Sequence, residues 1–189
     1  FYIIYINILY SMLRPTDFIG YAPFLIALAL SYYCDQNKNI IYDSKIKNTF
    51  ILLSLFSLVL YIYELFKSIV TILNTKIKLG DIFIIIHKLL FYNILTFALI
   101  YFTFYIHDDD NFFGMDRIYG INENINMNNF FIHKLITMVY FSIHTFFSLG
   151  FGDIYPSKLC VRFINVLQML FSYITTSYLF IRTMRFVER

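Results

Sequence analysis

The chain has 189 residues, of which 59% are hydrophobic and only 14% charged, and its net charge is +3. A soluble domain contains about 45–50% apolar and about 25% charged residues, so this composition excludes an ordinary soluble globule. It also excludes a disordered chain, because there is too much to bury and too little charge to repel. The basic residues are few and dispersed, which gives no support to a nucleic-acid partner. We therefore expect a polytopic protein in a lipid bilayer.

Polar breaks divide the first 73 residues into apolar runs. Arg14-Pro15-Thr16-Asp17 ends the first run, and a polar loop at residues 34–48 precedes the longest one. Glu64 and Lys67 lie three apart near the end of that run, so they can pair on a helix. Membrane helices are expected throughout residues 1–73, in three runs at residues 1–13, 18–33 and 49–73.

A charged segment and an uncharged one follow. Residues 74–88 mix lysine and aspartate with isoleucine and leucine, a pattern typical of an amphipathic helix lying at the membrane surface. Residues 89–106 carry no charge and are long enough for one crossing at about 1.5 Å per residue. The polar segment 107–133 opens with His107-Asp108-Asp109-Asp110, which is either a solvated cap or a metal cluster.

The stretch from residue 134 to residue 156 breaks the pattern of crossings. Residues 134–147 are apolar and helical in character but short, and they run into Ser148-Leu149-Gly150-Phe151-Gly152-Asp153. Two glycines, an aspartate and Pro156 would end any helix there. Since non-helical backbone at membrane depth is tolerated only inside protein or around water, we expect a re-entrant loop at a pore or a buried site. Residues 159–186 then form the last helix.

Glycine at every second position of this loop carries a specific chemistry. Gly150 and Gly152 permit alternating left- and right-handed backbone, which points successive carbonyls in one direction. Four such segments around an axis would stack rings of oxygen that replace the water shell of a dehydrated cation. The Ser148 hydroxyl would add a ring at the inner end, and Phe151 would pack against the short helix. A single loop cannot encircle an ion, so three further copies of the chain are the expected partners. The alternative is a glycine-containing loop in a transporter.

The residues from Thr145 to Asp153 resemble the potassium-channel signature Thr-x-x-Thr-x-Gly-Tyr/Phe-Gly-Asp, in the Gly-Phe-Gly form of small viral potassium channels. The resemblance implies an all-α membrane protein with a tetrameric pore domain at residues 89–189. The parts of that domain are an outer helix at 89–106, a turret at 107–133, a pore helix at 134–147, a filter at 148–153 and an inner helix at 159–186.

The resemblance also implies a role for each residue of the loop. Backbone carbonyls of the first four residues, with the Ser148 hydroxyl, would bind potassium, Gly152 would shape the outer mouth, and Asp153 would brace the filter. The filter residues are Ser148, Leu149, Gly150, Phe151 and Gly152, and the supporting residues are Asp153, Tyr140, His144 and Thr145. Ser148 and Leu149 replace the usual Thr and Val or Ile, which would loosen selectivity for potassium over sodium.

Two supporting positions differ from the family pattern. Tyr140 stands where a tryptophan commonly bonds the aspartate, and it keeps an O–H donor. His144 stands where some relatives carry a glutamate. It is either a packed histidine with a local partner or half of a His144–Asp153 pair that makes the filter sensitive to pH.

The first half of the chain carries a weaker resemblance. Asp17 precedes Pro23 by six residues, as in the third helix of voltage-gated-type potassium channels. Residues 49–73 would then be the fourth helix and residues 74–88 the linker to the pore. The fourth helix of that family needs a basic residue at every third position, and this one offers Lys67 alone. The resemblance implies a partial or vestigial voltage-sensor-like domain that is not strongly voltage-gated, and a complete four-helix protein is the competing interpretation.

The last helix has polar positions at Ser172, Thr175 and Thr176, which share one face. They either line a cavity below the filter or bond their own backbone. With the filter mouth outward, the C-terminus would be cytoplasmic. The sequence thus favours a potassium-selective channel without cofactors other than permeant ions, and no nucleophile–base pair points to an enzyme. The alternatives are a weakly selective cation channel and a non-conducting channel-like subunit.

Overall fold

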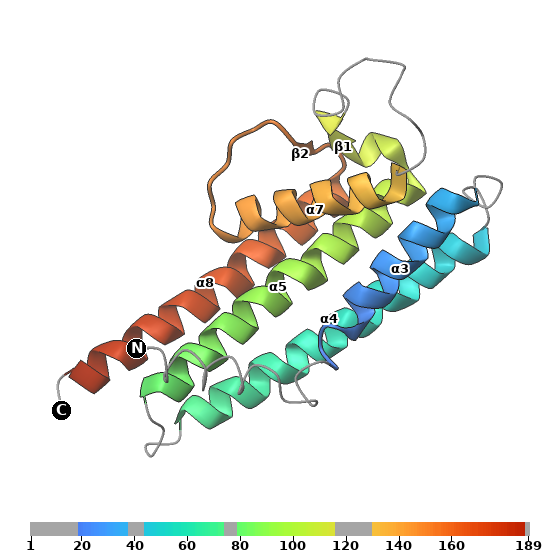
Figure 1. Cartoon of the computed structure of the whole chain (residues 1–189). Coiled ribbons are helices and arrows are strands. Elements are labelled where there is room, and N and C mark those ends of the chain that lie inside the picture. The colour runs from blue at the N-terminus through green and yellow to red at the C-terminus, as the bar shows by residue number, and fades with distance from the viewer. Residues whose placement is uncertain (1–18, 38–43, 74–78, 116–129, 188–189) are drawn as a thin grey trace, which may run out of the picture.

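The computed structural model describes residues 19–37, 44–73, 79–115 and 130–187, and these residues are almost entirely helical (Figure 1). The protein is an all-α membrane protein, and among the described residues three helices are long and apolar enough to cross a bilayer. The predicted run at residues 1–13 and most of the turret lie outside the described residues. The helices are α3 (Ala22–Gln36), α4 (Ser44–Leu73), α5 (Leu79–His107), α7 (Phe130–Phe146) and α8 (Leu159–Val187).

Helix α5 is the central element of the bundle. It lies between α4 and α8 in Figure 1, and α7 lies against its upper half. Half of the apolar window of α5 is buried inside the chain, compared with 28% for α4 and 22% for α8. Edge-to-face aromatic contacts fill this core, for example between Phe50 and Phe102 and between Tyr101 and Phe141. The large apolar side chains left exposed on α4 and α8 therefore face lipid or further protein.

The boundary between the predicted surface helix and the outer helix is absent. Helix α5 runs unbroken from Leu79 to His107, so residues 79–88 continue into residues 89–106. Within this helix, Lys88 Nζ lies 3.0 Å from Glu64 Oε2 of α4, so the charge of Lys88 is paired inside the bundle. Glu64 also pairs with Lys67 at 3.7 Å, as the spacing predicted.

A two-stranded ribbon closes the upper end of the bundle. Strand β1 (Phe112–Phe113) pairs antiparallel with β2 (Tyr155–Pro156), after the short 3₁₀ helix η2 (Asp109–Asn111). The Ser157 N–H also donates to the Asn111 carbonyl at 2.9 Å. The segment that follows residue 153 is thereby attached to the segment that follows α5. The C-terminal end of α8 lies at the opposite end of the bundle (Figure 1).

Candidate functional site

Residues 148–153, the re-entrant segment, leave the C-terminal end of α7 with an alternating backbone. Ser148, Gly150 and Gly152 have φ of +54°, +58° and +74°. Among the described residues Ser148 is the one non-glycine residue with positive φ, a conformation that costs an L-residue roughly 1–2 kcal/mol. The left-handed conformation therefore also occurs at Ser148, two residues before Gly150, although the Ser148 side chain disfavours it.

Part of the backbone of the re-entrant segment lacks hydrogen-bond partners in the described part of one subunit. The N–H groups of Ser148 and Leu149 donate to the carbonyls of Thr145 and His144, at 3.1 and 2.9 Å. No hydrogen bond within the described part of the chain reaches the backbone of residues 150–152. Since a Cβ on Gly150 would meet nothing within 4 Å, this side of the segment faces open space.

The outer end of the segment is fixed by an aspartate and a tyrosine. The Tyr140 hydroxyl donates to Asp153 Oδ2 at 2.6 Å, and the Ile154 N–H donates to Asp153 Oδ1 at 2.9 Å. The hydrogen bond from Tyr140, and then that from Ile154, lowers the pKa of the Asp153 carboxyl, so it is ionised at neutral pH. Tyr140 thus has the donor role expected of it.

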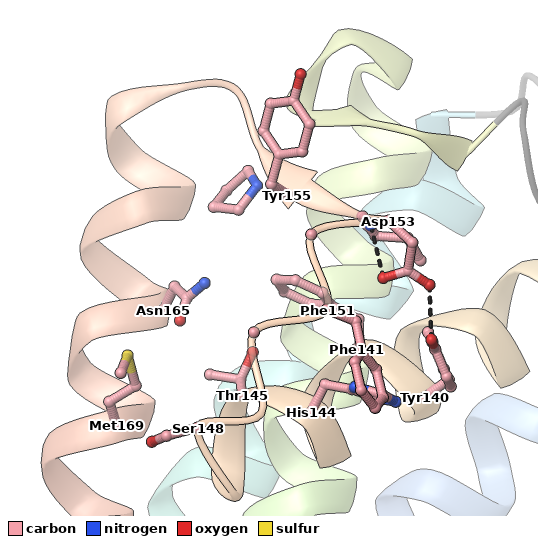
Figure 2. A pocket seen from close by; sticks show the side chains of 14 residues that line it. Tyr140, Phe141, His144, Thr145, Ser148, Phe151, Asp153, Tyr155, Asn165 and Met169 are labelled. Carbon is pink, nitrogen blue, oxygen red and sulfur yellow. Dashed lines mark hydrogen bonds between the residues drawn. The ribbon is translucent and has the colours of Figure 1, made fainter.

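His144 lies behind the segment, between two rings. Its ring centroid is 4.0 Å from that of Tyr140 and 4.3 Å from that of Phe151. Its Nδ1 is buried, with no hydrogen-bond partner among the described residues. Figure 2 shows these side chains around a cavity of about 230 Å³, with Asn165 and Met169 of α8 on its far side. His144 is therefore packed by rings, and the structure shows no hydrogen bond between it and Asp153.

An ion-channel family model matches residues 48–189, about three-quarters of the chain. The chain belongs to this ion-channel family. Its match includes α4, α5, α7, the re-entrant segment and α8. No curated protein and no solved structure matches the chain. The protein is accordingly an integral membrane protein of channel type.

Helix α8 of the channel holds the C-terminal half of α7. Gln168 is fully buried and donates to the Ser142 carbonyl at 3.0 Å, and it accepts from the Tyr101 hydroxyl at 2.8 Å. Ser172 donates to the Phe146 carbonyl at 2.8 Å. The Phe146 carbonyl belongs to the last turn of α7, where intrahelical partners run out, so Ser172 supplies the donor that the helix lacks there. Sequence periodicity alone did not reveal the role of Gln168, although a glutamine inside an apolar helix signals a buried partner.

The three polar positions of α8 do not share one environment. Ser172 and Thr175 are buried within the subunit, and Thr175 bonds the Phe171 carbonyl at 2.7 Å. Thr176 is exposed and bonds the Ser172 carbonyl at 2.9 Å. Of the three predicted cavity residues, the structure leaves Thr176 free to face a cavity. Ser172 faces α7 through its bond to Phe146, and Thr175 bonds Tyr61 of α4.

Thr145 is buried beneath the segment, where its carbonyl accepts from Ser148. Gly114, which the sequence analysis missed, contacts the outer end of the re-entrant segment at Asp153. Its φ is +89°, and a Cβ there would lie 1.8 Å from the Asp153 carbonyl oxygen. A glycine is therefore required where the turret crosses the re-entrant segment. The signal was present as one of two glycines in the turret, but the partner of Gly114 lies far along the chain.

The acidic residues after α5 act as a cap and an ion pair. Asp108 accepts the Asp110 N–H at 3.1 Å and pairs with Lys158. The hydrogen bond with Lys158 is the largest cause that lowers the pKa of Asp108. Within the described ranges, no group of three or more histidine, cysteine or acidic residues is placed to hold a metal ion.

Proposed function

We propose that four copies of this chain form a potassium-selective channel that conducts passively through a filter made of Ser148, Leu149, Gly150, Phe151 and Gly152. The observation that carries the proposal is the positive φ at every second residue of this segment. Positive φ at alternate residues supports an alternating left- and right-handed backbone, which points successive carbonyl oxygens in one direction. In rings of four, those oxygens replace the hydration shell of potassium, which is the permeant substrate.

The open side of the filter supports the need for further copies. Backbone groups without hydrogen bonds cost several kcal/mol each in a bilayer, so they must meet ions, water or protein. A single subunit leaves the backbone of residues 150–152 in that condition. Closed fourfold symmetry provides an axis where all four segments meet. Asp153 and Tyr140 support the filter at its outer end, and the end of α8 is cytoplasmic in this orientation.

Reversal potentials in mixed potassium and sodium solutions test the proposal. A potassium-selective pore shifts its reversal potential by about 59 mV for each tenfold change in the potassium gradient. An intermediate shift would indicate the weakly selective channel that Ser148 and Leu149 favour, because Ser148 combines a strained backbone with an unbranched hydroxyl side chain. The absence of current from surface-expressed protein would indicate a non-conducting subunit.

The N-terminal helices are proposed to be a vestigial voltage-sensor-like domain. Helix α4 carries Lys45 and Lys47 at its start and Lys67 toward its end, without a basic residue at each third position. Each charge crossing the membrane field gains about 2.3 kcal/mol per 100 mV, so few charges give weak voltage dependence. A shallow conductance–voltage relation is the expected result, and a steep one would contradict this assignment.

A further inference from the structure

The carboxylate of Asp35 lies at the first turn of α7, although Asp35 belongs to the end of α3. The Phe131 N–H donates to Asp35 Oδ1 at 2.7 Å, and the Ile132 N–H donates to Oδ2 at 3.1 Å. Asp35 is 3% exposed. Both carboxylate oxygens are thus engaged by the backbone of a helix that begins about a hundred residues later.

This contact caps the start of α7 and also joins α7 to α3. The first N–H groups of a helix have no intrahelical partner, and the helix dipole favours an anion there. The residue that precedes a helix ordinarily satisfies them. Here α3 supplies the acceptor, and hydrogen bonds to an ionised acceptor are roughly twice as strong as neutral ones. The start of α7 is therefore tied to the end of α3.

Helix α7 connects this tie to the re-entrant segment. It contains 17 residues, so it is about 25 Å long, and residue 148 follows two residues after it. Near its start, Lys134 Nζ donates to the Tyr105 hydroxyl at 2.6 Å. Near its end, the Leu149 N–H bonds the His144 carbonyl. A displacement of α3 therefore reaches the re-entrant segment through one continuous helix.

We propose that Asp35 is a positioning residue that couples α3 to permeation through α7. The inference rests on the proposed conduction through residues 148–152 and adds to it a route by which the N-terminal helices adjust the filter. Asp35 itself touches no ion. It sets where the first turn of α7 lies, and thereby where the last turn presents the filter.

The test compares Asp35→Asn and Asp35→Ala with Asp109→Asn, which makes the same charge change at an exposed turret residue. Asparagine keeps one acceptor but turns an N–H₂ donor toward a second N–H donor. Reversal potential and the rate of current decay are measured in cells expressing the full chain, with surface protein quantified. We expect the sodium-to-potassium permeability ratio or the decay rate to change at least about threefold in Asp35→Asn and more in Asp35→Ala. Asp109→Asn should match the wild type.

A rescue variant separates capping from coupling. Asp35→Ala combined with Ile132→Glu returns a carboxylate to the first turn of α7 without a connection to α3. Recovery of surface protein without recovery of permeability or decay supports coupling. Recovery of both would overturn it, because Asp35 would then serve as a cap alone. Wild-type permeation and decay in Asp35→Asn would overturn it as well.

A silent wild type at the cell surface would refute the proposed function but would leave the coupling testable. Hydrogen exchange of the purified protein in lipid nanodiscs then gives the answer. Asp35→Asn should raise exchange at the α7 start and also within residues 148–153, relative to Asp109→Asn. A rise confined to the α7 start would overturn the coupling.

Discussion

The two ends of α7 are held by groups of different character. At its start, the acceptor is the carboxylate of Asp35 from α3. At its end, the donors are neutral: the Gln168 amide and the Ser172 hydroxyl of α8. The last turn of α7 itself contains no lysine or arginine, although a cation there would stabilise the helix by about 0.3–1 kcal/mol.

The difference follows from what lies beyond each end. The buried start of α7 lies a helix length, about 25 Å, from its other end, so the Asp35 carboxylate acts mainly on groups near that start. Beyond its end lies the proposed filter, where a fixed positive charge would repel the permeant cation. The neutral Ser172 hydroxyl bonds the last carbonyl of α7, that of Phe146, and leaves the negative end of the helix dipole directed toward the proposed ion path. The charge pattern is therefore compatible with cation conduction and opposes anion conduction.

The largest effect should come from disturbing the filter without touching either end of α7. Gly150→Ala places an L-side chain at φ +58°, which costs roughly 1–2 kcal/mol in each of four subunits. No neighbouring atom blocks the new Cβ, so assembly should survive while current is abolished. Patch-clamp recording with native gel analysis checks both.

Gly80→Ala is the matched control for this variant. Gly80 lies near the start of α5, and a Cβ there also meets nothing. Alanine should preserve current, since it favours a helix by about 1 kcal/mol over glycine. Potassium current of wild-type size in Gly150→Ala would refute the filter assignment.

Local sequence predicted the backbone of residues 148–153 better than it predicted the bundle around it. Glycine spacing indicated the alternating backbone, and the resemblance to potassium channels indicated the bond from Tyr140 to Asp153; both features involve residues close in sequence. The tie from Asp35 to α7 and the crossing at Gly114 depend on distant partners, so no local pattern reports them. The sequence also showed that Ser172 and Thr175 share one face of the last helix, but it did not show which neighbouring helix covers that face. The partner of Lys88, Glu64, likewise lies on another helix.

A cation introduced beyond the end of α7 tests the charge comparison directly. Thr176 is exposed one turn after Ser172, so Thr176→Lys should place an ammonium toward the proposed cavity. Repulsion in four copies should lower the single-channel conductance at least about fivefold. Thr176→Gln is the neutral control and should conduct nearly as the wild type does. Equal conductance in both would show that Thr176 lies away from the ion path.

The outer end of the filter should give a smaller effect. Tyr140→Phe removes the hydroxyl that donates to Asp153, a bond worth about 1 kcal/mol, or roughly fivefold in a rate. We expect current decay to accelerate by about that factor. Because this bond lowers the pKa of Asp153, its contribution is complete at neutral pH and is lost only as pH falls below the ordinary aspartate value, about 3.9. The difference in the rate of current decay between the wild type and Tyr140→Phe should therefore stay constant from pH 6 to pH 8. A difference that grows or shrinks within that range would point to another titrating group.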